Sequence, residues 1–150
     1  MMPIIRPARA DEFDEVARVW MESWVSTGFG TASEALLTQL RERVPAEVAN
    51  GWSLHVADDN GRLAAMLAFH IPKRHLDQVF VAPEYHGKGI GRMLLAFARR
   101  HMPDEMWLRC VRENEKAWRW YEREGFVFEG EDISPVTGHT MKCYRWRKPE

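Results

Sequence analysis

The stretch that decides the fold is residues 79–92, which read VFVAPEYHGKGIGR. An apolar run that ends at Pro83 is typical of a strand, and the glycines that follow lead into a helical pattern. Glycines at positions 87, 89 and 91 let the backbone take positive φ and let its N–H groups approach a ligand without obstruction by a Cβ atom. The first turn of the next helix adds unpaired N–H groups and the positive end of its dipole. A phosphate or pyrophosphate is therefore the expected occupant of this turn.

Two better-known phosphate-binding motifs do not match this stretch. A P-loop requires Ser or Thr directly after its lysine, and Lys88 is followed by Gly89. The dinucleotide fingerprint GxGxxG fails because the third glycine comes one residue early and because the loop lies mid-chain. Taken alone, the stretch leaves two interpretations open. It is either a phosphate cradle with Lys88 and Arg92 at its rim, or a turn whose glycines merely satisfy backbone geometry.

The sequence on both sides of this stretch predicts a single α/β domain over residues 1–150. Asn60-Gly61 separates two apolar runs and predicts a hairpin. Asp11 is expected to cap the first helix, and Pro45 followed by Asn50-Gly51 to end the second. The expected architecture is a mixed, mostly antiparallel sheet of six to seven strands flanked by about four helices. The expected elements are, in order, a strand at 4–5, helices after 11 and around 36–40, strands at 52–57, 63–71 and 75–81, a helix from 89, a strand at 106–111, a helix at 114–124, and strands at 126–130 and 141–146.

Composition excludes several functional classes. Lys and Arg number 21 against 22 Asp and Glu, so no global field draws the chain to nucleic acid or to an anionic membrane, and neither is an expected partner. Cys110 and Cys143 form no CxxC pair, which argues against a cysteine zinc site and favours the reducing cytoplasm as the location. No apolar run approaches the ~20 residues needed to span a bilayer.

A second motif lies downstream of the glycine-rich turn. Its spacing is N-x-x-A-x-x-x-Y-x-x-x-G-F, formed by Asn114, Ala117, Tyr121, Gly125 and Phe126. With residues 86–91 (HGKGIG), the two motifs resemble the GNAT superfamily, the general N-acetyltransferases that use acetyl-CoA. The family's glycine motif is Q/R-x-x-G-x-G/A, and the chain departs from it only at the first position, where it carries His86.

The resemblance implies transfer of an acetyl or acyl group from acetyl-CoA to a primary amine by direct attack in a ternary complex. It implies that the sheet splays near Val79 and Val81, whose backbones pair with the pantetheine arm, and that Asn114 lies along that arm. Because His86 replaces the usual Gln or Arg, the resemblance does not define the contact that the side chain at this position makes. The candidate cofactor-binding residues are Val79, Phe80, Val81, His86, Gly87, Lys88, Gly89, Ile90, Gly91, Arg92, Asn114, Ala117 and Tyr121.

Three residues are candidates for the chemistry. The resemblance places the Tyr121 hydroxyl near the CoA sulfur, and a phenol with a pKa near ~10 can donate a proton to the departing thiolate. The alternative for Tyr121 is a core aromatic. His75 and Asp77 share one strand face and are candidates for the general base, against the alternative of a surface pair with no role. A metal held by His75, Asp77 and His139 has no ligand-spacing motif behind it, so no metal is expected.

The acceptor is left open by the sequence. The resemblance implies that the helix pair after the first strand walls the acceptor site, so Trp20, Trp24 and Phe29 are candidates to line it, and aromatic walls suit a cationic amine. The alternative for Trp20 is the core, because it lies in a regular apolar stripe. An amino acid, a polyamine, an aminoglycoside, a protein N-terminus or a lysine would each be compatible, so the expected partner is a small-molecule or peptide amine. The resemblance also implies a homodimer. The alternative functions are a catalytically silent, acyl-CoA-binding regulatory module and a nucleotide binder that does not use CoA.

Overall fold

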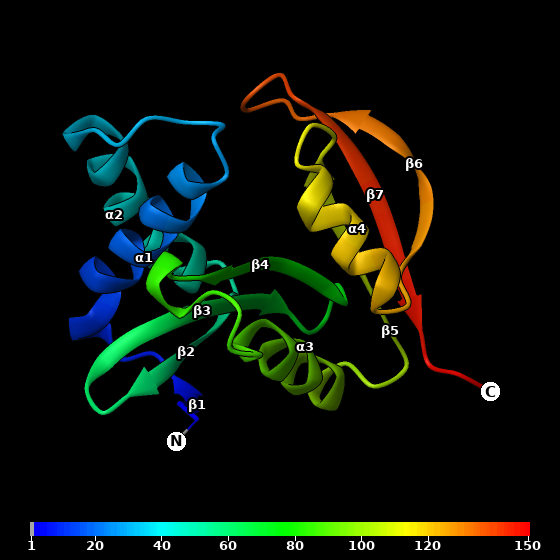
Figure 1. The fold of residues 1–150 in the computed structure, drawn as a ribbon, viewed down its shortest axis with the longest axis horizontal. Helices are drawn as coiled ribbons and strands as arrows, with labels where there is room; N and C mark the ends of the chain where they lie inside the picture. Colours follow the sequence, from blue (N-terminus) through cyan, green and yellow to red (C-terminus); the bar gives the residue numbers. More distant parts are fainter. Residues whose placement is uncertain (1) are drawn as a thin grey trace.

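In the computed structural model, which describes residues 2–150, seven strands form one sheet in the order β1-β2-β3-β4-β5-β7-β6 (Figure 1). Neighbouring strands are antiparallel except β4 and β5. The expected α/β class, element order and number of strands are confirmed. The elements are β1 (Ile4–Pro7), η1 (Ala10–Glu12), α1 (Phe13–Ser26), α2 (Glu34–Ala49), β2 (Ser53–Asp59), β3 (Arg62–His70), β4 (His75–Val81), η2 (Pro83–Tyr85), α3 (Ile90–His101), β5 (Glu105–Val111), α4 (Glu115–Arg123), β6 (Val127–Ile133) and β7 (Thr140–Arg147).

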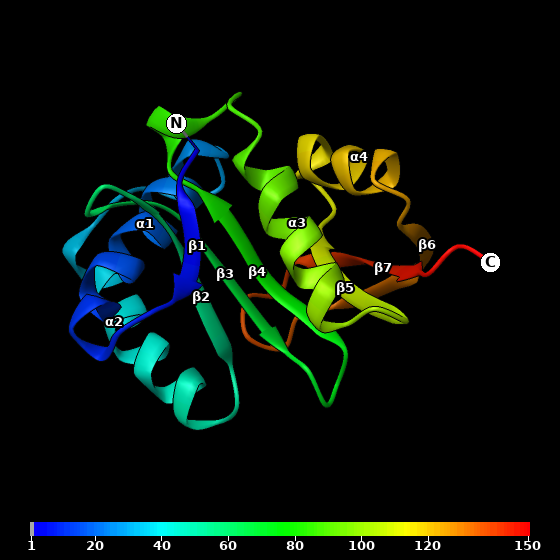
Figure 2. The same cartoon turned by 90° about the horizontal axis from the view of Figure 1, so that it is seen from below.

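Two apolar cores lie on opposite faces of the sheet. Figure 2 shows α1 and α2 on one side of strands β1 to β4 and α3 on the other. Residues of β4 alternate between the two cores, so that Leu76 and Val79 contact the α3 side while Phe80 contacts the α1 side. The strand therefore contributes side chains to both layers.

The hairpin between β2 and β3 forms as predicted. Asp59 pairs with Arg62, and the two residues between them, Asn60 and Gly61, take φ values of 53° and 95°. Positive φ at both central positions matches the right-handed twist of the flanking strands.

Two expected helix boundaries were wrong. The second helix ends at Ala49 with Asn50 as its C-cap, as Asn50-Gly51 predicted, but Pro45 does not end it, because α2 continues through this residue. Leu40 and Val44 on this helix are buried against α1 and the sheet, and that burial offsets the hydrogen bond that proline removes. Asp11 lies in the 3-10 turn η1 rather than at the α-helix cap, and α1 begins at Phe13.

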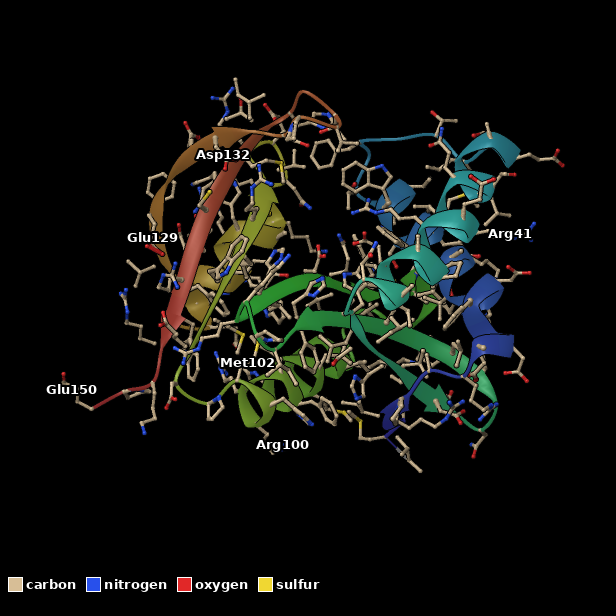
Figure 3. The ribbon with its side chains drawn as sticks, turned by 180° about the vertical axis from the view of Figure 1, so that it is seen from behind. Arg41, Arg100, Met102, Glu129, Asp132 and Glu150 are labelled. Carbon is tan, nitrogen blue, oxygen red and sulfur yellow. The ribbon has the colours of Figure 1, made fainter. Side chains whose placement is uncertain are left out.

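The sheet consists of two wings that meet at a single point. We call β1 to β4 the first wing and β5, β7 and β6 the second wing. The two wings pair only at His75 and Trp107 among the described residues, where the Trp107 N–H donates to the Arg74 carbonyl at 2.9 Å. Beyond this point β4 and β5 diverge, as Figure 1 shows. Figure 3 shows the wings from behind, with Glu129 and Asp132 on β6 far from Arg41 on α2.

Candidate functional site

The glycine-rich loop joins β4 to α3 through the 3-10 turn η2. Gly87 and Gly89 take φ values of 78° and 81°, and Gly89 is the N-cap of α3. The first backbone hydrogen bond of α3 runs from the Met93 N–H to the Gly89 carbonyl at 3.2 Å. No N–H of residues 87–92 has a hydrogen-bond partner within the part of the chain that the structure describes. Six consecutive backbone donors are therefore available to an anion.

The space in front of this loop is open. A Cβ atom built on Gly87 or Gly89 would meet no atom within 4 Å, so these glycines are required by their φ angles and not by close packing. The Lys88 ammonium lies 5.4 Å from the centre of the Tyr85 ring. Arg92 is paired with Glu124 at 3.3 Å, while its side chain remains 77% exposed. Both predicted rim cations therefore lie beside the loop.

The outer edge of β4 has no neighbouring strand next to this loop, although side chains of Ser23 and His86 bond to the Val81 carbonyl. The Ala82 N–H donates to the Ala64 carbonyl at 2.8 Å, which sets the alternation of the β3–β4 ladder. By that alternation the N–H and C=O groups of Val79 and Val81 point away from β3, toward the diverging β5. A ligand with amide groups could pair with this edge as an added strand.

The start of α3 lies between helix α4 and the end of β4. A Cβ atom on Gly91 would lie 3.4 Å from Cζ2 of Trp120 and 4.0 Å from Cγ2 of Val81. The start of α3, the end of β4 and α4 thus meet at one place. Sequence reasoning missed Trp120, because nothing in its local pattern distinguishes a contact with the loop from ordinary core packing.

Tyr121 lies on α4 beside this meeting point. Its ring packs against Trp120 and Phe126, with ring centres 5.0 and 5.5 Å away. Burial raises the pKa of the Tyr121 phenol, and the neighbouring Cys110 raises it further. The hydroxyl makes no hydrogen bond to the described residues, so it is a protonated donor without a protein partner.

Asn114 has a structural role at the start of the same helix. It is the N-cap of α4, and its side-chain oxygen accepts from the Ala117 N–H at 3.4 Å. This contact explains the Asn at the first position of the downstream motif; because the donor is a backbone N–H, it does not explain the Ala at position 117. Contact between Asn114 and a pantetheine arm stays a prediction.

The candidate bases lie on β4 near the point where the wings join. The His75 ring stacks on Trp107 with ring centres 3.8 Å apart. Burial lowers the pKa of His75, and the nearby Asp77 carboxylate opposes this by raising it. Asp77 lies at a bulge opposite Ala68 and Phe69, and its Oδ2 accepts from Nε1 of Trp52 at 2.7 Å.

Asp77 also belongs to a group that sequence reasoning did not identify. One ligand atom each of Glu47, His70 and Asp77 lies within 4.8 Å of the others, and all three side chains are half-buried. These residue types can bind a divalent cation. The group comes from α2, β3 and β4, so no local spacing could have indicated it. His75 and His139, considered from the sequence, are not part of it.

The three aromatic residues suggested for the acceptor site are placed differently. Trp20 is 5% exposed and lies in the core, where its ring is 5.7 Å from Trp52 and 6.3 Å from Phe80. Trp24 and Phe29 are half-buried, with ring centres 5.8 Å apart. Only this second pair is accessible enough to contact a ligand.

Comparison with known proteins identifies the family. Residues 13–126 match the acetyltransferase (GNAT) family. The chain is 29% identical over 154 residues to a probable N-acetyltransferase of Mycobacterium tuberculosis, which covers 89% of this chain and 86% of that protein. It is 27% identical over 136 residues to the peptidyl-lysine N-acetyltransferase YjaB of Escherichia coli, covering 87% of this chain and 86% of that protein.

Solved structures agree with this assignment at the level of the fold. The solution structure of apo-form YjaB from Escherichia coli superposes with a TM-score of 0.80 at 22% identity, covering 99% of this chain and 100% of that chain. The PaiA N-acetyltransferase of Thermoplasma acidophilum, solved in complex with coenzyme A, superposes with a TM-score of 0.78 at 22% identity, covering 98% and 99%. No helix among residues 2–150 is long and apolar enough to cross a membrane. The chain is an acetyltransferase and belongs to the GNAT family.

Proposed function

We propose that this protein transfers an acetyl group from acetyl-CoA to a primary amine of a small molecule or peptide, by direct attack in a ternary complex. The observation that carries the proposal is the row of six unpartnered backbone amides at residues 87–92, next to the unpaired outer edge of β4. A diphosphate fits the first feature and an amide-bearing arm fits the second. Coenzyme A contains both groups.

Different residues are proposed to contact different parts of acetyl-CoA. The amides of residues 87–92 take the diphosphate, and Lys88 supplies positive charge beside it. The outward-facing backbone of Val79 and the N–H of Val81 take the pantetheine arm, with Phe80 between them, while the Val81 carbonyl accepts from Ser23 and His86. Asn114 and Ala117 at the start of α4 form the opposite wall. This arrangement would fix the thioester between β4 and α4.

The chemistry assigns one proton donor and one proton acceptor to this chain. Acetyl-CoA supplies a thioester carbonyl, which a neutral amine attacks. Tyr121 donates its phenolic proton to the departing sulfur, and its raised pKa keeps it protonated at neutral pH. His75, whose lowered pKa keeps the ring neutral, accepts the proton that the acceptor's ammonium form loses before it attacks, with Asp77 beside it. The new C–N bond replaces the C–S bond of the thioester, and the second proton of the nitrogen returns to the Tyr121 phenolate, which restores the phenol.

The acceptor is proposed to approach from the side of α1 and α2. Trp24 and Phe29 lie there as an accessible aromatic pair, and Asp77 faces the same side through its bond to Trp52. The relative YjaB is named for peptidyl-lysine, a primary alkyl amine. We include a peptide lysine among the acceptors to be tested.

Calorimetry with acetyl-CoA, CoA and ATP tests the donor half of the proposal. Acetyl-CoA and CoA are expected to bind, and ATP is expected to bind at least tenfold more weakly, because it has no pantetheine arm to pair with the β4 edge. Binding of ATP as tight as that of acetyl-CoA would overturn the assignment of the donor.

The acceptor half is tested by thiol release from acetyl-CoA with a panel of amines. The panel contains an amino acid, a polyamine, an aminoglycoside and lysine peptides. Amine-dependent release above background hydrolysis is the expected result. Tight binding of acetyl-CoA without release for any amine would favour the silent binding module over the enzyme.

A further inference from the structure

His86 occupies the one position at which the chain departs from the glycine motif of its family. Its side chain is exposed, and its Nε2 atom lies 2.9 Å from the carbonyl oxygen of Val81. A carbonyl oxygen can only accept a hydrogen bond, so Nε2 carries the proton and donates it. The ring therefore links the first residue of the motif to the last residue of β4.

The carbonyl that His86 contacts is one of the outward-facing groups of the β4 edge. It also accepts from the hydroxyl of Ser23 at 2.9 Å, and Ser23 is only 4% exposed. Two donors satisfy the two lone pairs of this oxygen. The carbonyl of Val81 is thus already paired, whereas the backbone of Val79 and the N–H of Val81 still point toward the diverging β5.

His86 is also the last fixed point before the six free amides. Upstream, the loop is anchored by the Tyr85 hydroxyl, which donates to Asp59 at 2.7 Å, and by the His86 N–H, which donates to the Pro83 carbonyl at 3.2 Å. Downstream of His86, the next backbone N–H that donates a hydrogen bond to a described residue is that of Met93. The His86 side chain is therefore the last of these anchors before the six free amides, and the one that lies nearest to them in the sequence.

We propose that His86 is a positioning residue for acetyl-CoA, which holds the amides of residues 87–92 in their binding arrangement by donating to the Val81 carbonyl. The proposal rests on the proposed function, since acetyl-CoA is the ligand assigned to these amides. A loop that is already ordered loses less conformational freedom when its ligand binds. The imidazolium and the Nε2–H tautomer both carry the required proton, so the contact does not depend on one charge state.

The test compares His86→Ala and His86→Gln with the wild-type protein. Calorimetry gives the Kd for acetyl-CoA, and thiol release with the best amine of the panel gives KM and kcat. We expect His86→Ala to raise both Kd and KM about three- to tenfold, as for the loss of one net hydrogen bond, with kcat changed less than about twofold. His86→Gln keeps an N–H donor and should remain within about twofold of the wild type.

His101→Ala is the matched control. Its ring is also exposed, and its Nδ1 lies 3.0 Å from the Phe97 carbonyl at the far end of α3. Losing this second ring-to-carbonyl contact should leave the Kd for acetyl-CoA unchanged. In the free protein, amide spectra should show the signals of Gly87 and Gly89 shifted by His86→Ala and not by His101→Ala.

The outcomes separate this inference from the function on which it rests. If the wild type does not bind acetyl-CoA, the proposed function is wrong and the inference fails with it. If the wild type binds but His86→Ala binds equally or more tightly, the ring does not position the loop, and only the inference fails. Equal weakening by His86→Gln and His86→Ala would also overturn it, because the donor would then not be the group that matters.

Discussion

Different chemical groups face the ligand in two regions of the site. These regions are the donor loop at residues 87–92 and the acceptor side formed by α1, α2 and β4. The loop presents main-chain amides, and its shape is set by the positive φ of Gly87 and Gly89. The acceptor side presents side chains, such as the Trp24–Phe29 pair and Asp77, whose positions depend on packing. Side-chain substitutions in the loop should therefore have small effects on binding and catalysis. Substitutions that change the backbone of the loop, or the side chains of the acceptor side, should have larger effects.

Tyr121→Phe should have the largest effect, because Tyr121 is the one donor-side residue whose side chain is assigned to the chemistry. Removing a general acid costs about 10²- to 10⁴-fold, so kcat should fall within this range while the Kd for acetyl-CoA stays within about twofold. The hydroxyl bonds to no described residue, so the melting temperature should hardly change. Steady-state thiol release measures kcat, and thermal unfolding measures the melting temperature.

Tyr144→Phe is the matched control for this change. Tyr144 is fully buried, and its hydroxyl donates to Glu122 at 2.7 Å. Its loss should cost about 1–2 kcal/mol of stability and leave kcat unchanged. A Tyr121→Phe enzyme that turns over as fast as the wild type would rule out the acid role.

Gly89→Ala should come next and affect binding instead of chemistry. Gly89 has φ of 81° with nothing within 4 Å of a built Cβ, so alanine fits the space but strains the backbone. That strain costs roughly 1–2 kcal/mol, or about 5- to 30-fold in the Kd for acetyl-CoA if the loop relaxes away from its binding shape. Calorimetry measures the change.

Gly138→Ala separates local strain from a loss specific to the loop. Gly138 has φ of 76°, also with nothing within 4 Å, and it lies in the β6–β7 connection. Gly138→Ala should lower the melting temperature about as much as Gly89→Ala does, because the backbone strain is similar. It should bind acetyl-CoA as the wild type does. If both glycine variants bind normally, the amides of residues 87–92 are not the donor site.

The same difference explains how much the sequence could predict. The loop was predictable because its glycines, strand and helix are contiguous over residues 79–92, and local backbone preferences determine its shape. The contact of Ser23 with Val81 joins residues 58 positions apart, and the group of Glu47, His70 and Asp77 spans three elements. Such contacts depend on how the layers pack, which single-sequence periodicity does not encode.

Packing also decided where sequence patterns were misleading. Trp20 was an acceptor candidate, but its helical spacing with the other apolar residues of α1 also indicated the core, and there it packs against Trp52 and stacks on Phe80. The continuation of α2 through Pro45 has the same origin, because burial of Val44 outweighs a local breaker. The β4–β5 splay, in contrast, was expected from the family resemblance alone.

A smaller effect, on the pH dependence of stability, is expected from the charge of His75 on the acceptor side. Burial lowers its pKa in the folded protein, whereas in the unfolded chain it titrates near ~6.5. Below that pH the unfolded state binds more protons than the folded state, so stability falls as the pH falls. His75→Gln should therefore lose less stability than the wild type between pH 7.5 and pH 5, as urea midpoints would show.

His55 provides the comparison that makes this measurement specific. Burial also lowers the pKa of His55, which lies on β2 and stacks on Phe69, away from the proposed acceptor. His55→Gln should flatten the pH dependence of stability in the same direction, but only His75→Gln should also remove the acidic limb of the kcat/KM profile. If His75→Gln keeps that limb, another group accepts the proton, and Asp77, which lies two residues further along the same strand and is bonded to Trp52, becomes the residue to replace.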